Sequence, residues 1–285
     1  MKQIHVRLAA VVAMLAPLAT YAAQAPADAT GSTVVRVATY NVQVRRSLDE
    51  FLGGVQPLLQ RSDIVGLQEM DTRDKEAALS GIEGWDHYSV RPAFQETVLW
   101  RSDRFTFVSG RVAKISDAAY IGNELPGQTS NQLARYVSVV RLLDNVTGHR
   151  VSVIDAHVIQ GATRGGRPWP GRPRLFAIFK QNLVNLAGIT TTEKRWGQVF
   201  VLGDFNAGWV ADRNHLLKRF PIRTFSRLSM RSMWRYSRPT NGLGTHNDAL
   251  IDQVFSTLRP LSCRVQLDLS GFSDHRPAIA TYPTD

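Results

Sequence analysis

Short runs of β-branched and aliphatic residues recur along the chain, and several of them end at a carboxylate, an amide or an imidazole. The run VFVLG at residues 199–203 leads directly into Asp204, and Asn206 follows two positions later. Strands that end at one edge of a sheet bring such residues together, even when they lie far apart in sequence. The same pattern places Asn41 after VATY, Glu69 after VGLQ, His157 after VIDA, Asp252 within LID, and Asp274 and His275 within SDH.

The strand-like runs predict a largely β domain with helices between some of its strands. Strands and helices do not alternate strictly, which disfavours a simple doubly wound parallel sheet. We therefore expect one α+β (α/β) domain built mainly of β layers. β-branched runs and turn residues predict strands at residues 33–42, 63–70, 96–115, 134–158, 198–206, 248–257 and 273–282. Helical spacing and helix-favouring residues predict helices at residues 48–59, 72–79 and 175–186.

The first residues have the composition of a secretory signal peptide. A basic start precedes an apolar run at residues 8–18, and small residues follow it. The run is too short to span a bilayer with stop-transfer flanks. We therefore expect residues 1–23 to be a signal peptide, residues 24–32 a linker and residues 33–285 the domain. The mature protein would be secreted, extracellular or periplasmic.

Composition limits the kinds of site that the chain can carry. With 44% apolar residues it can bury a substantial core, and its one cysteine, Cys263, excludes a disulfide framework or a multi-cysteine zinc site. We expect Cys263 to be a small buried core residue. The formal net charge of +10 and the pI near 10.2 suit a protein that meets polyanions. Genomic base composition is an alternative source of the excess of arginine over lysine.

The polar residues at the strand ends are carboxylates, amides and histidines, which together suit a divalent cation. Oxygen ligands favour a hard cation such as Mg²⁺, Mn²⁺ or Ca²⁺. Mg²⁺ usually takes one or two carboxylates together with waters and substrate phosphate oxygens. The set therefore predicts a site for Mg²⁺, with Mn²⁺ or Ca²⁺ as alternatives.

Six segments resemble motifs of the endonuclease/exonuclease/phosphatase superfamily, to which deoxyribonuclease I belongs. They are TYNVQ, LQEM, DAHV, GDFN, LIDQVF and SDHRP, in the family's order and over nearly all of the chain after the predicted signal peptide. One motif alone is weak, because GDFN is also an ordinary turn, but six in order are specific. The resemblance implies a four-layer α-β-β-α sandwich, in which helices flank two packed mixed sheets. It also implies a divalent-metal-dependent hydrolase of phosphodiester bonds.

The resemblance implies which residues hold the metal. Glu69 would be the principal ligand, with Asn41 and Asp274 beside it. The alternatives are that Asn41 caps a helix starting near Val44 and that Glu69 is a solvated strand end.

The resemblance also implies roles in proton transfer. His157 and His275 would move protons, since an imidazole titrates near neutrality, and Asp252 would orient His275. Asp204 would orient or deprotonate the attacking water, and Asn206 would donate to a phosphate oxygen.

Two further carboxylates bear on His157. Glu96, in QETVLW, is the candidate carboxylate that holds the His157 ring, the alternative being a surface position. Asp155 stands where family members commonly have Asn, and this departure adds a negative charge near the site.

The substrate stays open within the superfamily, because fold and core motifs do not determine it. A nuclease is favoured, because residues 213–238 contain eight basic residues and no acidic ones. Five of their arginines recur every four positions, which on a helix would form a cationic stripe for phosphates, within the limit set by Pro221. We expect Arg227 and Arg231 of this stripe to bind substrate. The alternative is a solvated basic face without a partner.

A sphingomyelinase-like phospholipid phosphodiesterase, or another phosphatase, is the second candidate. The Gly/Pro-rich segment at residues 163–174 carries Arg164, Arg167 and Trp169, which we also expect to contact substrate. An aromatic side chain among cations suits a membrane interface or base stacking. The alternative is that Trp169 only packs on the following helix and contacts no substrate.

A third candidate is a catalytically silent exported binding protein of the same fold. The presence of every matching metal and proton-transfer residue argues against it. We expect a monomer without a transmembrane segment.

Overall fold

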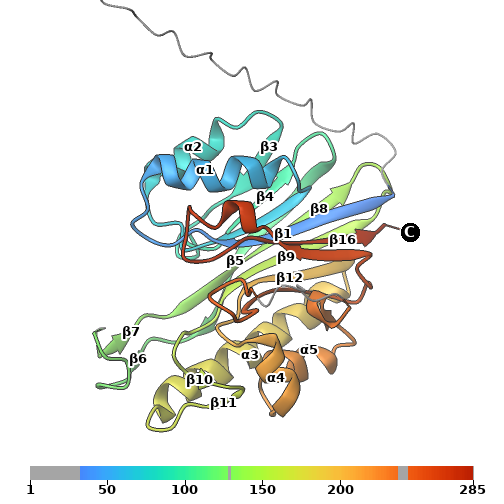
Figure 1. Cartoon of the computed structure of the whole chain (residues 1–285). Coiled ribbons are helices and arrows are strands. Elements are labelled where there is room, and N and C mark those ends of the chain that lie inside the picture. Colours follow the sequence, from blue (N-terminus) through green and yellow to red (C-terminus); the bar gives the residue numbers. More distant parts are fainter. Residues whose placement is uncertain (1–32, 128–129, 237–242, 285) are drawn as a thin grey trace, which may run out of the picture.

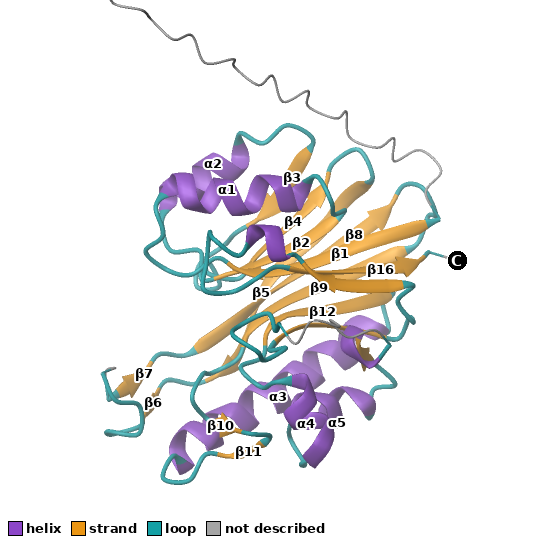
Figure 2. Cartoon of the chain, in the orientation of Figure 1, coloured by secondary structure: helices purple, strands orange, loops and turns teal. Residues whose placement is uncertain are grey.

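The computed structural model describes residues 33–127, 130–236 and 243–284, so the predicted signal peptide and linker lie outside the described residues. It confirms the four-layer sandwich. Two six-stranded mixed sheets pack face to face, and helices cover both outer faces (Figures 1 and 2). No helix of the described residues is long and apolar enough to cross a membrane.

The first sheet joins the two ends of the domain. Its central strand runs antiparallel to the last strand and parallel to the second. The strands in order across the sheet are β15 (Ser262–Val265), β16 (Ala278–Pro283), β1 (Val34–Asn41), β2 (Ile64–Gln68), β4 (Thr97–Arg101) and β3 (Trp85–Tyr88). Its outer face is covered by α1 (Leu48–Leu59) and α2 (Arg73–Ser80) (Figure 2).

The second sheet has the same number of strands and its own helical layer. Across the sheet the strands are β13 (Arg231–Ser232), β14 (Asp252–Ser256), β12 (Gln198–Asp204), β9 (Arg150–His157), β8 (Arg135–Asp144) and β5 (Phe105–Ser116). Its outer helices are α3 (Pro173–Lys194), α4 (Trp209–His215) and α5 (Pro221–Ser226). Two hairpins, β6–β7 (Ala119–Tyr120, Asn131–Gln132) and β10–β11 (Thr163–Arg164, Arg167–Pro168), and two 3-10 turns, η1 (Met233–Arg235) and η2 (Leu267–Leu269), complete the fold.

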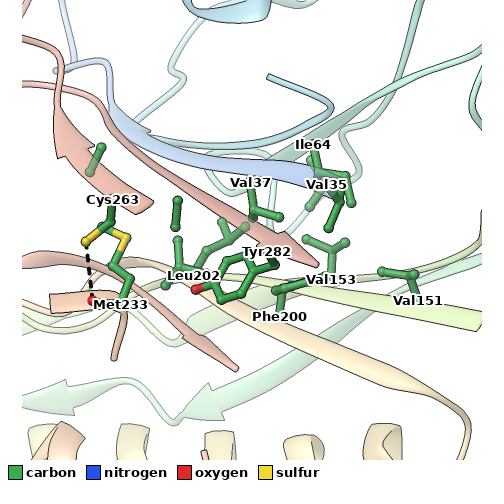
Figure 3. Packing of buried hydrophobic residues seen from close by; sticks show 14 of the residues in the cluster. Val35, Val37, Ile64, Val151, Val153, Phe200, Leu202, Met233, Cys263 and Tyr282 are labelled. Carbon is green, nitrogen blue, oxygen red and sulfur yellow. Dashed lines mark hydrogen bonds between the residues drawn. The ribbon is translucent and has the colours of Figure 1, made fainter. Parts of the chain in front are cut away.

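The central core lies between the two sheets. Phe200 of β12 packs on Tyr282 of β16, with 5.1 Å between ring centroids (Figure 3). Cys263 is buried in the same cluster, as predicted, and its thiol donates to the Met233 carbonyl at 3.3 Å. Each fully buried aliphatic side chain of such a core contributes about 1.5–3 kcal/mol. Because both faces of the inner strands are covered, β2 is buried along its whole length.

The register of the strands assembles the site. β1 and β2 are parallel and end together, with Asn41 opposite Gln68. In the other sheet β9 and β12 are parallel and also end together, with His157 opposite Asp204. β14 runs the other way and begins with Asp252 opposite Asp204. Since the two sheets pack on each other, these strand ends meet at one edge of the sandwich.

The predicted helical stripe of arginines is not formed. Pro221 is the first residue of α5, because proline lacks the N–H that a helix interior needs, and Arg219 lies before it with a left-handed φ of 66°. Arg227 caps the end of α5, and Arg231 lies in β13. The arginines therefore come from a short helix, a strand and turns, and they do not share one helix face.

Candidate active site

The edge where the parallel strands end carries an open pocket with a volume of about 490 Å³. Glu69, His157 and Asp274 line it together with Gln43 and Arg135. The other residues of the predicted constellation lie close to these pocket-lining side chains, at the distances given below. The structure thus brings together side chains that span most of the domain's sequence.

Glu69 is held in place by backbone and side-chain donors. The side-chain amide nitrogen of Asn41 lies 3.0 Å from Glu69 Oε1 and 3.3 Å from Asp204 Oδ2. The Val44 amide donates to Glu69 Oε2 at 3.0 Å. Glu69 itself has a left-handed φ of 65°, a conformation that costs a non-glycine residue about 1–3 kcal/mol and persists only where its surroundings hold it.

The donor set fits a hard divalent cation at Glu69 and Asp274. Both carboxylates line the same pocket, and their side chains are 24% and 47% exposed. Asn41 differs from the expectation, because its oxygen accepts from the Gln43 amide at 3.0 Å while its nitrogen faces Glu69. In this arrangement the Asn41 nitrogen orients the Glu69 carboxylate, and its oxygen already accepts from the Gln43 amide.

The predicted Asp252–His275 pair is present and buried. His275 Nδ1 lies 2.8 Å from Asp252 Oδ2, and its Nε2 lies 3.8 Å from Asp204 Oδ2. Burial alone would lower the pKa of His275, but the charge and hydrogen bond of Asp252, together with the charges of Asp204 and Asp274, raise that pKa to about 10. The imidazole is therefore a cation at neutral pH.

Asp204 lies between the two histidines. The Asn206 amide donates to Asp204 Oδ1 at 2.8 Å, in the tight turn that follows β12. Burial and the neighbouring charge of Asp252 raise the pKa of Asp204 to about 7, and the positive charge of His275 opposes this rise. A carboxylate that titrates near neutrality suits the acceptance of a proton.

His157 faces Asp204 and Asn206. Its Nε2 lies 3.6 Å from Asp204 Oδ2 and 3.3 Å from the side-chain nitrogen of Asn206. Burial lowers the pKa of His157 well below its ordinary value, and the positive charges of Arg135 and His275 lower it further. The two imidazoles therefore differ, with His157 neutral and His275 charged.

The predicted Glu96–His157 pair does not form. In the described part of the chain, the carboxyl group of Glu96 makes no hydrogen bond to His157, and Glu69 and Asp204 are the carboxylates within 4 Å of the His157 ring. Glu96 is buried rather than on the surface, and burial raises its pKa to about 8 while the charge of Arg135 lowers it. Arg135, and not His157, is therefore the charge partner of Glu96.

Asp155 lies between the sheets behind the pocket. Its Oδ1 accepts from the side-chain nitrogen of Gln68 at 2.6 Å, and its Oδ2 is buried without a partner among the described residues. Burial raises the pKa of Asp155 well above 3.8, and the charge of Glu96 adds to this rise. Burial therefore opposes the extra negative charge that Asp155 was expected to add near the site.

Two residues that line or flank the site were not predicted. Arg135 lines the pocket, and its guanidinium donates to the His157 carbonyl at 3.1 Å. It begins a strand rather than ending one, so the pattern of polar strand ends does not find it. His246 lies beside His275 in the turn before β14, where neither strand nor helix periodicity marks it.

The candidate substrate residues lie in two places. Arg164 and Arg167 are exposed on the β10–β11 hairpin, and the hydroxyl of Thr163 in this hairpin donates to the Asn206 carbonyl at 3.2 Å. Trp169 is half-buried, with the guanidinium of Arg172 only 3.5 Å from its ring centroid. The hairpin therefore contacts Asn206 of the site through Thr163, but Arg164 and Arg167 are not among the residues that line the pocket. Arg172 covers part of the Trp169 ring.

Arg227 and Arg231 lie elsewhere. Arg231 lines a second pocket of about 430 Å³ together with Arg213, Arg235 and Trp209, at the outer edge of the second sheet. Arg227 is the C-terminal cap of α5. The structure therefore does not bring these two predicted residues to the strand-end pocket.

Comparison with known proteins agrees with this geometry. The sequence matches the endonuclease/exonuclease/phosphatase family over residues 38–275. No curated protein matches it. An endonuclease/exonuclease/phosphatase from Bacteroides vulgatus is similar in structure, with a TM-score of 0.62, 18% identity, and coverage of 89% of this chain and 100% of that chain.

Two other similar structures carry different chemistries in their descriptions. TDP2 from D. rerio, complexed with a single-strand DNA product, has a TM-score of 0.61 at 12% identity and covers 89% of this chain and 100% of its own. A mannosyl-6-phosphatase from Bacteroides thetaiotaomicron has a TM-score of 0.58 at 14% identity, and the match covers 86% of this chain and 98% of that chain. At such low identity the likeness shows the shared fold.

Proposed function

The chain belongs to the endonuclease/exonuclease/phosphatase family and is a metal-dependent phosphoester hydrolase; from this premise we propose that it is a nuclease, which hydrolyses phosphodiester bonds of DNA or RNA. The observation that carries the proposal is the position of the β10–β11 hairpin. The hairpin carries two exposed arginines, and through Thr163 it contacts Asn206, beside a pocket lined by the Glu69 and Asp274 carboxylates. Arg164 and Arg167 bind backbone phosphates that flank the scissile bond.

Glu69 and Asp274 would hold the metal. A divalent cation bound there would supply charge neutralisation for the non-bridging phosphate oxygens. Mg²⁺ is the expected cation, because the ligands are carboxylate oxygens on an open pocket that leaves room for waters and phosphate. Asn41 keeps the Glu69 carboxylate aimed at the pocket.

The side chains around Asp204 perform the proton transfers. Asp204 orients the attacking water and accepts its proton, which agrees with its pKa of about 7. His275, held charged by Asp252, stabilises the developing negative charge and donates a proton. His157 and Asn206 hold the phosphate on the opposite side, where the neutral ring and the amide contact each other.

The lipid alternative has less support. Its strongest sequence feature was Trp169, and this ring is half-buried and covered in part by Arg172. The silent binding protein is disfavoured, because the carboxylates and both imidazoles converge at one pocket.

A parallel assay separates these candidates. The mature protein is incubated with plasmid DNA, RNA, sphingomyelin vesicles and a sugar phosphate, each with Mg²⁺, Mn²⁺, Ca²⁺ or EDTA. We expect metal-dependent cleavage of nucleic acid. Turnover of vesicles or of the sugar phosphate alone would overturn the nuclease, and no hydrolysis of any substrate would favour the silent binder.

We further propose that residues 1–23 direct export and that the mature protein acts outside the cytoplasm as a monomer. The support is the basic start, apolar run and small residues of the sequence. Expression of the full chain in a bacterium, followed by N-terminal sequencing of the periplasmic fraction, should find a start just after Ala22 or Ala23. Retention of Met1 in the cytoplasmic fraction would contradict export.

A further inference from the structure

A cluster of two imidazoles and a carboxylate lies beside the proposed hard-cation site. One ligand atom each from His246, Asp274 and His275 can be chosen such that all three lie within 4.8 Å of one another. His246 Nε2 is 3.9 Å from Asp274 Oδ2, and the two imidazole rings are 4.7 Å apart between centroids. His246 was not part of the predicted constellation, and its side chain is 35% exposed.

Backbone contacts hold this cluster in place. The turn before β14 is bridged to the SDH segment, with His246 opposite His275. The Arg276 amide donates to the Thr245 carbonyl at 2.6 Å, and the Arg276 guanidinium donates to the Gly244 carbonyl at 2.8 Å. The turn is closed by a bond from the His246 amide to the Ala249 carbonyl. The main chains of His246 and His275 are therefore held side by side.

The ring nitrogens of His275 are arranged as in a histidine metal site. Metal-binding histidines usually donate their second ring nitrogen to a carboxylate or another polar group, and His275 places Nδ1 against the Asp252 carboxylate at 2.8 Å. His246 places Nε2 3.9 Å from Asp274 Oδ2. Its Nδ1 lies 3.2 Å from the side-chain nitrogen of Asn247, so binding of a cation at His246 Nε2 requires that amide to turn and offer its oxygen to Nδ1.

We propose that His246, Asp274 and His275 form a transition-metal site, with Zn²⁺ as its cation. Two imidazoles and one carboxylate match the ligands that Zn²⁺ takes in three-ligand sites, where water fills the fourth position. Imidazole nitrogen favours Zn²⁺ over Mg²⁺, whereas Glu69 supplies only oxygen. The two sites share Asp274 and differ in their remaining ligands.

Occupation of this site has a consequence for turnover, and this part rests on the proposed function. Zn²⁺ bound at His275 Nε2 occupies the ring atom that lies 3.8 Å from Asp204 Oδ2, so this atom can no longer donate a proton there. It also withdraws Asp274 from the hard cation. Zn²⁺ therefore inhibits the Mg²⁺-dependent hydrolase.

The site itself is tested by binding, without reference to activity. The metal-free mature protein is titrated with Co²⁺ in the presence of excess Mg²⁺, and the visible absorption of nitrogen-coordinated Co²⁺ is recorded, with Zn²⁺ as competitor. We expect one such site in the wild type. His246→Ala should weaken Co²⁺ and Zn²⁺ at least tenfold, whereas His149→Ala, an exposed histidine on the turn between β8 and β9, should bind as the wild type does.

His246→Gln repeats the test with a polar side chain, should the alanine variant be unstable to heating. A wild type without the Co²⁺ band, or a His246 variant that binds as tightly as the wild type, would overturn the site. Inhibition of Mg²⁺-dependent hydrolysis by Zn²⁺ is measured for each variant relative to its own rate without Zn²⁺. Undiminished inhibition in the His246 variants would overturn the inhibitory role. Inactivity of the zinc-free wild type would count against the proposed function, while the Co²⁺ band would still decide the site.

Discussion

Four residues in or beside the pocket have left-handed backbone conformations that residues other than glycine rarely adopt. Gln43, Arg45, Glu69 and Asn206 have φ values of 57°, 67°, 65° and 48°. Each is held by specific bonds, such as the Val44 amide on Glu69 and the Asp204 carboxylate on the Asn206 amide. Strained backbone that is fixed in this way gathers at functional sites. The strain places the Glu69 carboxylate beyond the end of β2, where it faces the pocket.

The Glu69 carboxylate can be tested with an isosteric change. Glu69→Gln keeps the side-chain shape and removes the charge that binds the cation. We expect kcat to fall on the order of 10³-fold, which corresponds to several kcal/mol of lost transition-state stabilisation, while the thermal unfolding midpoint stays within a few degrees. Steady-state kinetics at saturating Mg²⁺ measures this, and a rate near that of the wild type would show that Glu69 is not a ligand.

Asp155 allows a test of stability against pH. Burial raises the pKa of Asp155 above 3.8 in the folded state, so the folded state binds this proton more tightly than the unfolded state. Its contribution to the free energy of unfolding is then fully present at low pH and is lost as pH rises above about 4. The Asp155→Asn side chain keeps an oxygen that accepts from Gln68, but it has no carboxyl group that binds or releases a proton.

The Asn variant should therefore be more stable than the wild type at pH 7, by about 1–3 kcal/mol, and the difference should shrink toward pH 4. Urea unfolding at several pH values measures it. A wild type that is more stable than the variant at pH 7 would mean that Asp155 is ionised and held by contacts that the distances do not show.

Residue types at strand ends predicted which side chains would converge, but not which atoms would meet. The β1–β2 and β9–β12 registers follow from apolar runs that the sequence displays, so Asn41, Glu69, His157 and Asp204 could be placed together in advance. Glu96 was assigned to the wrong partner. The choice between Arg135 and His157 depends on side-chain directions in three dimensions, which no spacing encodes.

At the scale of elements, tertiary contacts make some helices and strands longer or shorter than local sequence patterns predict. The helix expected at residues 175–186 runs to Lys194. Its last turns contain threonines that disfavour helix interiors, but their hydroxyls donate to carbonyls four residues back, and the buried Glu193 binds Arg141 of the sheet. The β10–β11 hairpin contains Gly and Pro and so gave no strand signal, although its Thr163 contacts Asn206 of the site.

The start of α1 gives a prediction at this scale. Ser47 and Glu50 form a capping box, in which the Ser47 hydroxyl accepts from the Glu50 amide and Glu50 Oε2 accepts from the Ser47 amide at 2.9 Å. Ser47→Ala removes one half of it. We expect a loss of about 1 kcal/mol in the free energy of unfolding, measured by denaturant titration. No loss would mean that water satisfies the amide groups of the first turn equally well.

At the scale of the whole molecule, each of the two sheets contains a pair of parallel strands, and both pairs end at the same edge of the sandwich. The two sheets therefore share one site. The first sheet supplies the carboxylate of Glu69, which we propose binds the metal, and the second supplies Asp204 and His157. Asn41 spans the interface by donating to both Glu69 and Asp204. Packing of the sheets is therefore a condition for the site, because neither sheet carries the complete set.

The net positive charge gives a prediction about partners. If the hairpin arginines bind phosphates, the affinity for single-stranded or duplex DNA falls as salt rises, and Arg164→Ala should reduce the slope of log K against log salt by about 1. Fluorescence anisotropy from low to moderate salt measures the slope. Arg264→Ala, an equal charge change on the edge strand β15, is the matched control. Equal slopes for the two variants would remove Arg164 from the interface.

The most direct test of the central claim uses a small phosphodiester that needs no recognition surface. Hydrolysis of bis(4-nitrophenyl) phosphate is followed for the wild type and for His275→Ala, first with Mg²⁺, then after EDTA, then after Mg²⁺ is restored. The wild type should hydrolyse it only with the cation present and regain its rate on restoration, and the variant should lose at least about 100-fold. Hydrolysis that EDTA does not stop, or a variant as fast as the wild type, would contradict the assembly of these strand-end residues into one metal-dependent catalytic site.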